Sequence, residues 1–298
     1  MFKRLIIATD VSEASYTLVK CLGGLRAYGA EECLLLQCLS AQETVSIALT
    51  YTTAVLEKNL QDLKEILEKQ GYKVEAYTVP GLAKNEINWQ VENNYSIIVV
   101  GAQEHSLTHE IFFGGLAYDV INSAQKPVLI IRMTNNHNDC LTFEGLSCMK
   151  TVGCDISNHI LFPTDFSENA DIAFSYVEKM VADGVKKVTL LHIQDKSRVS
   201  PRLEDRLDEF NKIDYARLEN MKKILQVKGN VAIEILLKYG SPSAEILKLV
   251  RELNVQLVVM GSQGRGYVKE LFLGSVSHNI ARHSASSVLL IPAKRQDE

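Results

Sequence analysis

The chain has 298 residues, 46% of them hydrophobic and 23% charged, which is enough to bury a full core and favours about two domains. The formal net charge of −4, without a run of lysines and arginines, argues against nucleic acid or a membrane surface as a partner. No apolar stretch approaches the roughly 18 residues of a membrane span. The first apolar run ends at Asp10, too early for a secretory signal, and the six cysteines show no CxxC spacing. We therefore expect a cytoplasmic protein with unpaired thiols.

The two halves of the chain resemble each other from end to end. KRLIIATDVSEAS, from Lys3, matches NHILFPTDFSENA, from Asn158. SIIVVGAQEHSLTHEIFFGGLAYDVINSAQKPVLII, from Ser96, matches QLVVMGSQGRGYVKELFLGSVSHNIARHSASSVLLI, from Gln256. The shared order of Asp, Gly, Phe and Gly in these segments predicts a duplication. The predicted organisation is a first domain at 1–133, a linker at 134–156 and a second domain at 157–298.

Each half alternates short apolar strands with amphipathic helices. In the second half, ILFPT and VTLLHI are apolar on both faces, as central parallel strands are. Between them, Ser167 predicts a helix N-cap, and a helical stripe of apolar residues ends at Asp183 and Gly184. A charged segment over 202–228 is interpreted as a helix with i,i+4 ion pairs, and a mobile lid is the alternative. The remaining elements are the strand VAIEILLKYG, a helix over 243–253, the strand QLVVM, a helix over 275–284 and the strand SVLLIP.

The alternation of strands and helices predicts an α/β fold. We expect two tandem open, mostly parallel five-stranded sheets with helices on both faces, joined by right-handed crossovers. In such sheets the carboxyl ends of the strands meet at one crevice, where ligands bind. Asp165 and Ile193 both fall at predicted strand ends.

A glycine-rich loop follows the strand QLVVM and reads Gly-x2-Gly-x9-Gly-Ser over residues 261–275. Glycines let backbone N–H groups approach an anion without an intervening Cβ. The closing Gly-Ser pair opens a helix whose free N–H groups face the same crevice. An ordinary strand-to-helix turn is the plainer interpretation of such a loop. Taken with Asp165, the spacing favours a cradle for phosphate, and nothing in the loop resembles a nucleophile with its base.

These features resemble the ATP-binding branch of the universal stress protein family, since PTDFS, LLH, VVMG and GSVS stand in the family's order over essentially the whole chain. The resemblance implies a Rossmann-like, adenine nucleotide alpha hydrolase-like fold. It also implies ATP, ADP or AMP in the second domain, with Mg²⁺ or Mn²⁺ carried by the phosphates. The residues it implies for the adenine and ribose are Pro163, Thr164, Asp165 and Ile193. Those it implies for the ribose and phosphates are Met260, Gly261, Gly264, Arg265, Gly274, Ser275, Val276 and Ser277, with the solvated face of the loop as the alternative for Arg265.

The first copy departs from this motif. Glu104 replaces the second glycine, Gly115 replaces the serine, and Ala8 replaces Pro163. A carboxylate about 4 Å from one phosphate charge costs about 4 kcal/mol at an effective dielectric constant of 20. We therefore predict a degenerate first domain that does not bind ATP in this mode. The motif residues that it retains are expected to serve turns and helix starts: Asp10, Gly101 and Gly114.

The leading functional hypothesis is a nucleotide-binding stress-response or signalling module. The last strands, PVLIIR and SVLLIP, would pair the two domains as an intramolecular pseudo-dimer, and a further homodimer and unidentified protein partners are open. One alternative is a slow ATPase or a phosphoryl or adenylyl transferase, although no general base, Walker lysine or acidic metal pair accompanies the loop. A scaffold that binds no nucleotide is another.

No catalytic residue and no metal ligand is predicted. Cys140, Cys148 and Cys154 of the linker fit no compact zinc spacing, and the sequence assigns them no role. His192 stands on an apolar strand, where a satisfied core histidine is favoured over a ligand contact.

Overall fold

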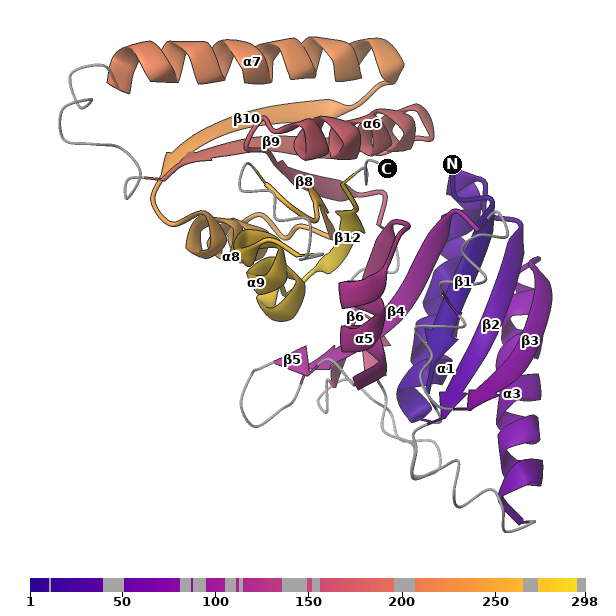
Figure 1. Cartoon of the computed structure of the whole chain (residues 1–298). Coiled ribbons are helices and arrows are strands. Elements are labelled where there is room, and N and C mark those ends of the chain that lie inside the picture. Colours follow the sequence, from indigo (N-terminus) through magenta and orange to yellow (C-terminus); the bar gives the residue numbers. More distant parts are fainter. Residues whose placement is uncertain are drawn as a thin grey trace, which may run out of the picture. The chain divides into compact units, whose positions relative to one another are not determined.

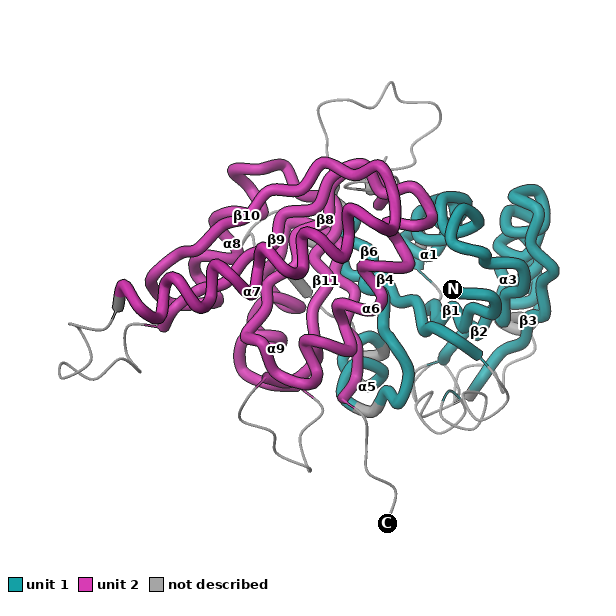
Figure 2. The backbone as a smooth tube through the Cα atoms, turned by 90° about the horizontal axis from the view of Figure 1, so that it is seen from above, with its two compact units in different colours: residues 1–154 teal, residues 155–298 magenta. Residues whose placement is uncertain are grey.

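The computed structural model divides the chain into two compact units, Met1–Cys154 and Asp155–Glu298, which Figure 2 colours separately. Both units repeat one α/β pattern. The residues that the structure describes are 1–10, 12–39, 51–80, 87, 95–104, 111–112, 115–135, 149–151, 156–195, 207–264 and 273–293.

The first unit is built on five parallel strands in the order β3-β2-β1-β4-β6. Two short strands add to it, since β5 pairs antiparallel with β4 and β7 pairs antiparallel with β6. Its elements are β1 (Arg4–Thr9), α1 (Glu13–Lys20), the 3-10 helix η1 (Cys21–Tyr28), β2 (Glu32–Leu39), α3 (Tyr51–Lys69), β3 (Lys73–Pro80), β4 (Ile97–Glu104), β5 (Ile111–Phe112), α5 (Gly115–Ser123), β6 (Val128–Asn135) and β7 (Met149–Thr151).

The second unit has the same order of parallel strands, β10-β9-β8-β11-β12. Its elements are β8 (His159–Pro163), α6 (Glu168–Ala182), β9 (Lys187–Gln194), α7 (Leu207–Lys228), β10 (Ala232–Tyr239), α8 (Pro242–Glu252), β11 (Leu257–Gly261), α9 (Ser275–His283) and β12 (Ser287–Ile291). Figure 1 shows α6 and α7 on one face of this sheet and α8 and α9 on the other. The predicted fold, two tandem five-stranded parallel sheets with helices on both faces, is confirmed.

Local sequence signals account for the boundaries of the first crossover helix of the second unit. The Ser167 side chain caps α6 by accepting a hydrogen bond from the Ala170 N–H at 3.3 Å. The helix ends at Asp183, after which Gly184 takes a positive φ of 106°, a conformation that glycine adopts without steric cost. Both boundaries agree with the sequence-based prediction, because capping depends on residues close in the chain.

The central strands of the second unit are buried on both faces, as their apolar sequences predict, whereas the edge strand β10 is partly exposed along its length. In β8 the residues from His159 to Phe162 are buried, and the Phe162 ring packs against Phe174 of α6 with centroids 5.6 Å apart. All five residues of β11 and of β12 are buried as well. The sheet of the second unit therefore supplies a rigid frame on which residues at the strand ends are held in place.

The cysteines are not all unpaired. Cys21 is disulfide-bonded, so the prediction of unpaired thiols is wrong for this residue. It fails because the inference rested on spacing within the sequence, which says nothing about residues that meet only in the folded chain. Cys33 and Cys38 are free and buried in β2, and burial raises the pKa of both thiols, so these two act as small apolar side chains.

In the part of the chain that the structure describes, the helices are too short or too polar to cross a membrane.

Candidate functional site

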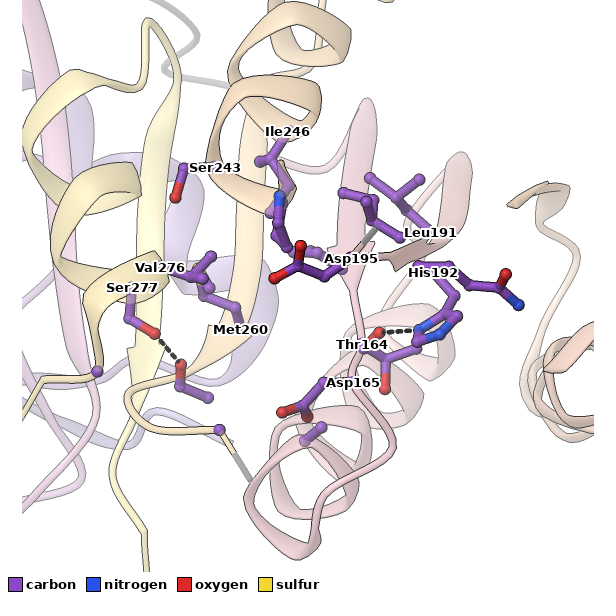
Figure 3. A pocket seen from close by; sticks show the side chains of 18 of the residues that line it. Thr164, Asp165, Leu191, His192, Asp195, Ser243, Ile246, Met260, Val276 and Ser277 are labelled. Atoms are coloured by element: carbon purple, nitrogen blue, oxygen red, sulfur yellow. Dashed lines mark hydrogen bonds between the residues drawn. The ribbon is translucent and has the colours of Figure 1, made fainter. Parts of the chain in front are cut away.

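A cavity of about 920 Å³ opens in the second unit at the carboxyl ends of its strands, and Figure 3 shows its lining. The chain leaves β8 toward α6 on one face and leaves β11 toward α9 on the other, so a crevice remains between these neighbouring strands. The start of α8 and the amino-terminal part of α7 complete the walls. Eleven of the twelve residues proposed from the sequence line this one cavity: Pro163, Thr164, Asp165, Ile193, Met260, Gly261, Gly264, Gly274, Ser275, Val276 and Ser277. Arg265 lies outside the described residues.

The turn after β8 brings Asp165 to the cavity. Asp165 Oδ1 accepts a hydrogen bond from the Ser167 N–H at 3.1 Å, and the Phe166 N–H donates to Thr164 Oγ1 at 3.0 Å. Phe166 has a φ of 58°, which costs a residue with a side chain about 1–2 kcal/mol. Figure 3 shows the Asp165 carboxylate directed into the cavity. Surrounding contacts must therefore hold this strained turn in the shape that presents Asp165.

At two positions of the loop only glycine fits, because polar side chains occupy the space where a Cβ would stand. A Cβ added to Gly264 would lie 2.6 Å from Asp165 Oδ2. A Cβ added to Gly261 would lie 2.7 Å from Asn169 Nδ2, which itself donates to the Gln263 carbonyl at 3.0 Å. Both approaches are closer than carbon can come to these atoms. The glycines thus let the backbone pass beside Asp165 and Asn169 and leave it open to a ligand.

The amino-terminal end of α9 faces the same cavity. Gly274 is its N-cap, with an extended backbone and a N–H that donates to the Ser262 carbonyl at 2.8 Å. No N-cap side chain bonds to the helix, so the N–H groups of its first turn are available to an anion. Ser275 is exposed at this end, whereas the buried Ser277 donates its hydroxyl to the Gly261 carbonyl at 2.9 Å (Figure 3). The Ser277 hydroxyl therefore ties α9 to β11.

Part of the cavity wall was not predicted. Phe210, Ile213, Asp214 and Arg217 of α7 line it, as do Asp195 after β9 and the residues around the start of α8. The four α7 residues follow the spacing i, i+3, i+4, i+7, which puts them on one face of the helix. That spacing is present in the sequence. Because the face carries both apolar and charged residues, it could not be distinguished from a solvent-exposed face with ion pairs. The helix interpretation of the segment is correct from Leu207 onward, and 202–206 lie outside the described residues.

A cluster of polar side chains joins β9 to α7 at the cavity wall. Nδ1 of His192 lies 2.7 Å from the Thr164 carbonyl oxygen, and Nε2 lies 3.5 Å from Asp214 Oδ2. The same carboxylate accepts a hydrogen bond from Gln194 Nε2 at 3.0 Å, and its other oxygen lies 3.6 Å from the Arg217 guanidinium. The side chains of His192 and Asp214 are 8% and 14% exposed. His192 is thus a buried histidine with both ring nitrogens beside protein oxygens.

The first unit has a different structure where the glycine loop would stand. Strand β4 continues through Glu104, whose partner in the antiparallel ladder is Ile111 of β5. The corresponding strand of the second unit, β11, ends three residues earlier in the alignment, at Gly261. Gln103 and Glu104, which match Gln263 and Gly264 of the glycine loop, are therefore part of an antiparallel β-ladder in the first unit.

The motif residues retained by the first unit have local structural partners. Asp10 Oδ1 accepts hydrogen bonds from the Ser12 N–H and the Ser15 hydroxyl, both at 3.1 Å, and also contacts the Ser12 hydroxyl. A Cβ on Gly101 would lie 2.6 Å from the Cε of Met133. The expected structural roles of Asp10 and Gly101 agree with these contacts, and Gly114 lies outside the described residues.

Within the described ranges, no three or more His, Cys, Asp or Glu side chains are grouped so that they could hold a metal ion. The linker cysteines, Cys140, Cys148 and Cys154, lie outside those ranges.

Comparisons with known proteins point to one family. A model described as the Universal stress protein family matches residues 1–132 and 157–292. The universal stress protein MJ0577 of Methanocaldococcus jannaschii is 33% identical over 154 residues, covering 45% of this chain and 94% of its own. The universal stress protein YxiE of Bacillus subtilis is 28% identical over 146 residues, covering 45% and 98%. The structure of a universal stress protein from Archaeoglobus fulgidus shares the fold over 98% of both chains, with 23% identity and a TM-score of 0.74.

Proposed function

Because the chain belongs to the universal stress protein family, with one family domain in each half, we propose that its second domain binds an adenine nucleotide and that its first domain does not. The observation that carries this proposal is the cavity at the strand ends of the second unit, where a glycine loop, an uncapped helix start and Asp165 converge. ATP, ADP and AMP share the groups that this cavity would recognise. Nucleotide binding would alter the surface offered to partners, as expected of a stress-response or signalling module.

The two ends of the cavity suit the two ends of a nucleotide. The side made by Pro163, Thr164 and Asp165 of the β8 turn, with Ile193 and Met260, would receive adenine and ribose. The opposite side would receive the phosphates, since no side chain caps the start of α9 and the α9 dipole favours negative charge by about 0.3–1 kcal/mol. The residues proposed for this side are Gly261, Gly264, Arg265, Gly274, Ser275, Val276 and Ser277. A Mg²⁺ or Mn²⁺ ion would be bound through the phosphates themselves.

The geometry favours binding over rapid turnover. His192 lines the cavity, but its ring nitrogens are directed at Thr164 and Asp214, so the ring is not positioned to accept a proton from water or a ligand. Any hydrolysis of ATP is expected to stay below about 1 per second, the lower end of the kinase range. A slow ATPase or transferase is the alternative function.

A titration series of adenosine, AMP, ADP and ATP, measured by calorimetry with and without Mg²⁺, tests this proposal. Affinity should increase with the number of phosphates, because each added charge gains N–H donors from the loop and from α9. Equal affinity for adenosine and ATP would contradict the phosphate cradle. The absence of binding for all four ligands would contradict a nucleotide site and favour the scaffold alternative.

The pairing of the two domains as an intramolecular pseudo-dimer and a further homodimer are predictions from the sequence, which identifies no protein partner.

A further inference from the structure

We propose that His192 is a positioning residue that couples the nucleotide-binding turn of the second unit to helix α7. It would hold the Thr164–Asp165 peptide with one ring nitrogen and Asp214 with the other, so that the placement of Asp165 and the position of α7 depend on each other. This inference rests on the proposed nucleotide site and adds to it an element that responds to the ligand.

The first half of the coupling is the contact with the turn. The Thr164 carbonyl and the Asp214 carboxylate can only accept, so both contacts are made when each ring nitrogen carries a hydrogen, and Nδ1 then donates to Thr164 across 2.7 Å. The imidazole also packs against the Phe166 ring, with centroids 4.6 Å apart. Phe166 is the residue with the left-handed backbone, and Asp165 directly precedes it. His192 therefore contacts the strained turn on both sides of Asp165 in the sequence, and Figure 3 shows the contact with Thr164.

The second half is the contact with α7. Asp214 approaches Nε2 of His192 and accepts the Gln194 amide hydrogen, which ties the helix to two residues of β9. Arg217, one turn further along α7, lies with its guanidinium carbon 5.1 Å from the Phe166 ring centroid. The helix is thus fixed to the turn both directly and through His192. Because Phe210 and Ile213 of the same helix face line the cavity, a ligand would contact α7 as well as the turn.

The first unit shows that the fold does not need these side-chain contacts at this position. Gln37 occupies the place of His192 in the matching strand β2 and is fully buried. Neither its side-chain nitrogen nor its oxygen has a hydrogen-bond partner among the described residues. The position therefore tolerates a buried polar side chain that makes no side-chain hydrogen bond within the described residues. The contacts of His192 with the turn and with α7 therefore occur in the second unit, which has the cavity, and Gln37 makes no matching side-chain hydrogen bond among the described residues of the first.

Three substitutions each remove one half of the coupling. His192→Asn keeps a nitrogen near the position of Nδ1, and so the bond to Thr164, but is too short to reach Asp214. His192→Gln keeps a nitrogen near the position of Nε2 and loses the bond to Thr164. Asp214→Asn removes the charge from the α7 side alone. The matched control is Glu219→Gln, the same chemical change on the same helix at a residue that does not line the cavity.

The measurements are ATP affinity by calorimetry and hydrogen exchange of the α7 amides with and without ATP. In the wild type and in Glu219→Gln, ATP should slow exchange along α7. In both histidine variants and in Asp214→Asn, binding should persist with about tenfold lower affinity, as expected for the loss of one buried polar contact, and the slowing of exchange in α7 should be lost. Far-ultraviolet circular dichroism and urea unfolding establish that each variant is folded.

Two results would overturn the inference in distinguishable ways. If the wild type binds ATP and the folded variants match it in affinity and in α7 protection, His192 is a packing residue and the nucleotide site stands without it. If the wild type binds no ATP, the proposed function fails and the coupling falls with it.

Discussion

Gly264→Glu, which copies the residue of the first domain, should weaken ATP binding by about 1,000-fold. A carboxylate about 4 Å from a phosphate charge costs about 4 kcal/mol at an effective dielectric constant of 20, and each 1.4 kcal/mol is a factor of about ten. The structure adds a steric cost, because any Cβ at this position meets Asp165 Oδ2 at 2.6 Å. The variant thus repels the phosphates and displaces the carboxylate that the turn presents.

Calorimetric titration of ATP into three variants separates these effects. Gly264→Ala carries the steric cost without the charge and should bind with intermediate affinity. Val227→Glu adds the same charge at a side chain that is 86% exposed at the far end of α7, and it should bind like the wild type. Wild-type affinity in Gly264→Glu would mean that the phosphates do not approach the glycine loop.

Gly261→Ala should destabilise the second unit by about 3 kcal/mol, whereas Gly101→Ala should cost the first unit less than about 1 kcal/mol. The two glycines occupy matching positions at the ends of β11 and β4. A Cβ on Gly261 collides with the Asn169 amide, which is buried and hydrogen-bonded to the Gln263 carbonyl, so the collision also breaks a buried hydrogen bond. A Cβ on Gly101 collides only with the terminal methyl group of Met133, which can rotate away, and lies at ordinary contact distance from Leu18.

Urea unfolding, with hydrogen exchange followed separately in peptides of each unit, measures the two free energies of unfolding. The wild type provides the reference for both units, and each variant serves as the control for the other. An equal decrease in the free energy of unfolding of the two units would show that the side chain beside the glycine does not determine the size of the destabilisation. A loss in Gly261→Ala with ATP affinity unchanged would show that Asn169 supports the strand end without shaping the site.

The sequence was sufficient to predict the fold because its signals are local and repeated. Strands such as ILFPT and QLVVM are apolar on both faces, which only a sheet covered by helices on both sides accommodates. The Ser167 cap and the Asp183–Gly184 stop depend on neighbours within four residues. The duplication supplied the same signals twice, so one interpretation of strand order served for both halves.

The residues of the site that stand at strand ends could be predicted from the sequence. Those contributed by α7 to the cavity wall could not. Pro163, Gly261 and Ser275 stand directly at the ends of elements, so their convergence follows from parallel topology. Asp214 and its neighbours on α7 reach the cavity only because of how that helix packs on β9 and β10, which spacing along the chain does not specify. The extension of β4 through Glu104 and the disulfide at Cys21 likewise depend on residues that meet only in the folded unit.

The central claim is that one domain of the tandem pair holds a nucleotide and the other does not. The number of ATP molecules bound per chain, measured by calorimetry on the intact wild-type protein with Mg²⁺, tests it most directly. We expect one ATP per chain, because Glu104 and the continued strand β4 take the place of the open glycine loop in the first unit. Two ATP molecules per chain would contradict the account, since the first domain would then bind a nucleotide without the cradle on which the proposal rests.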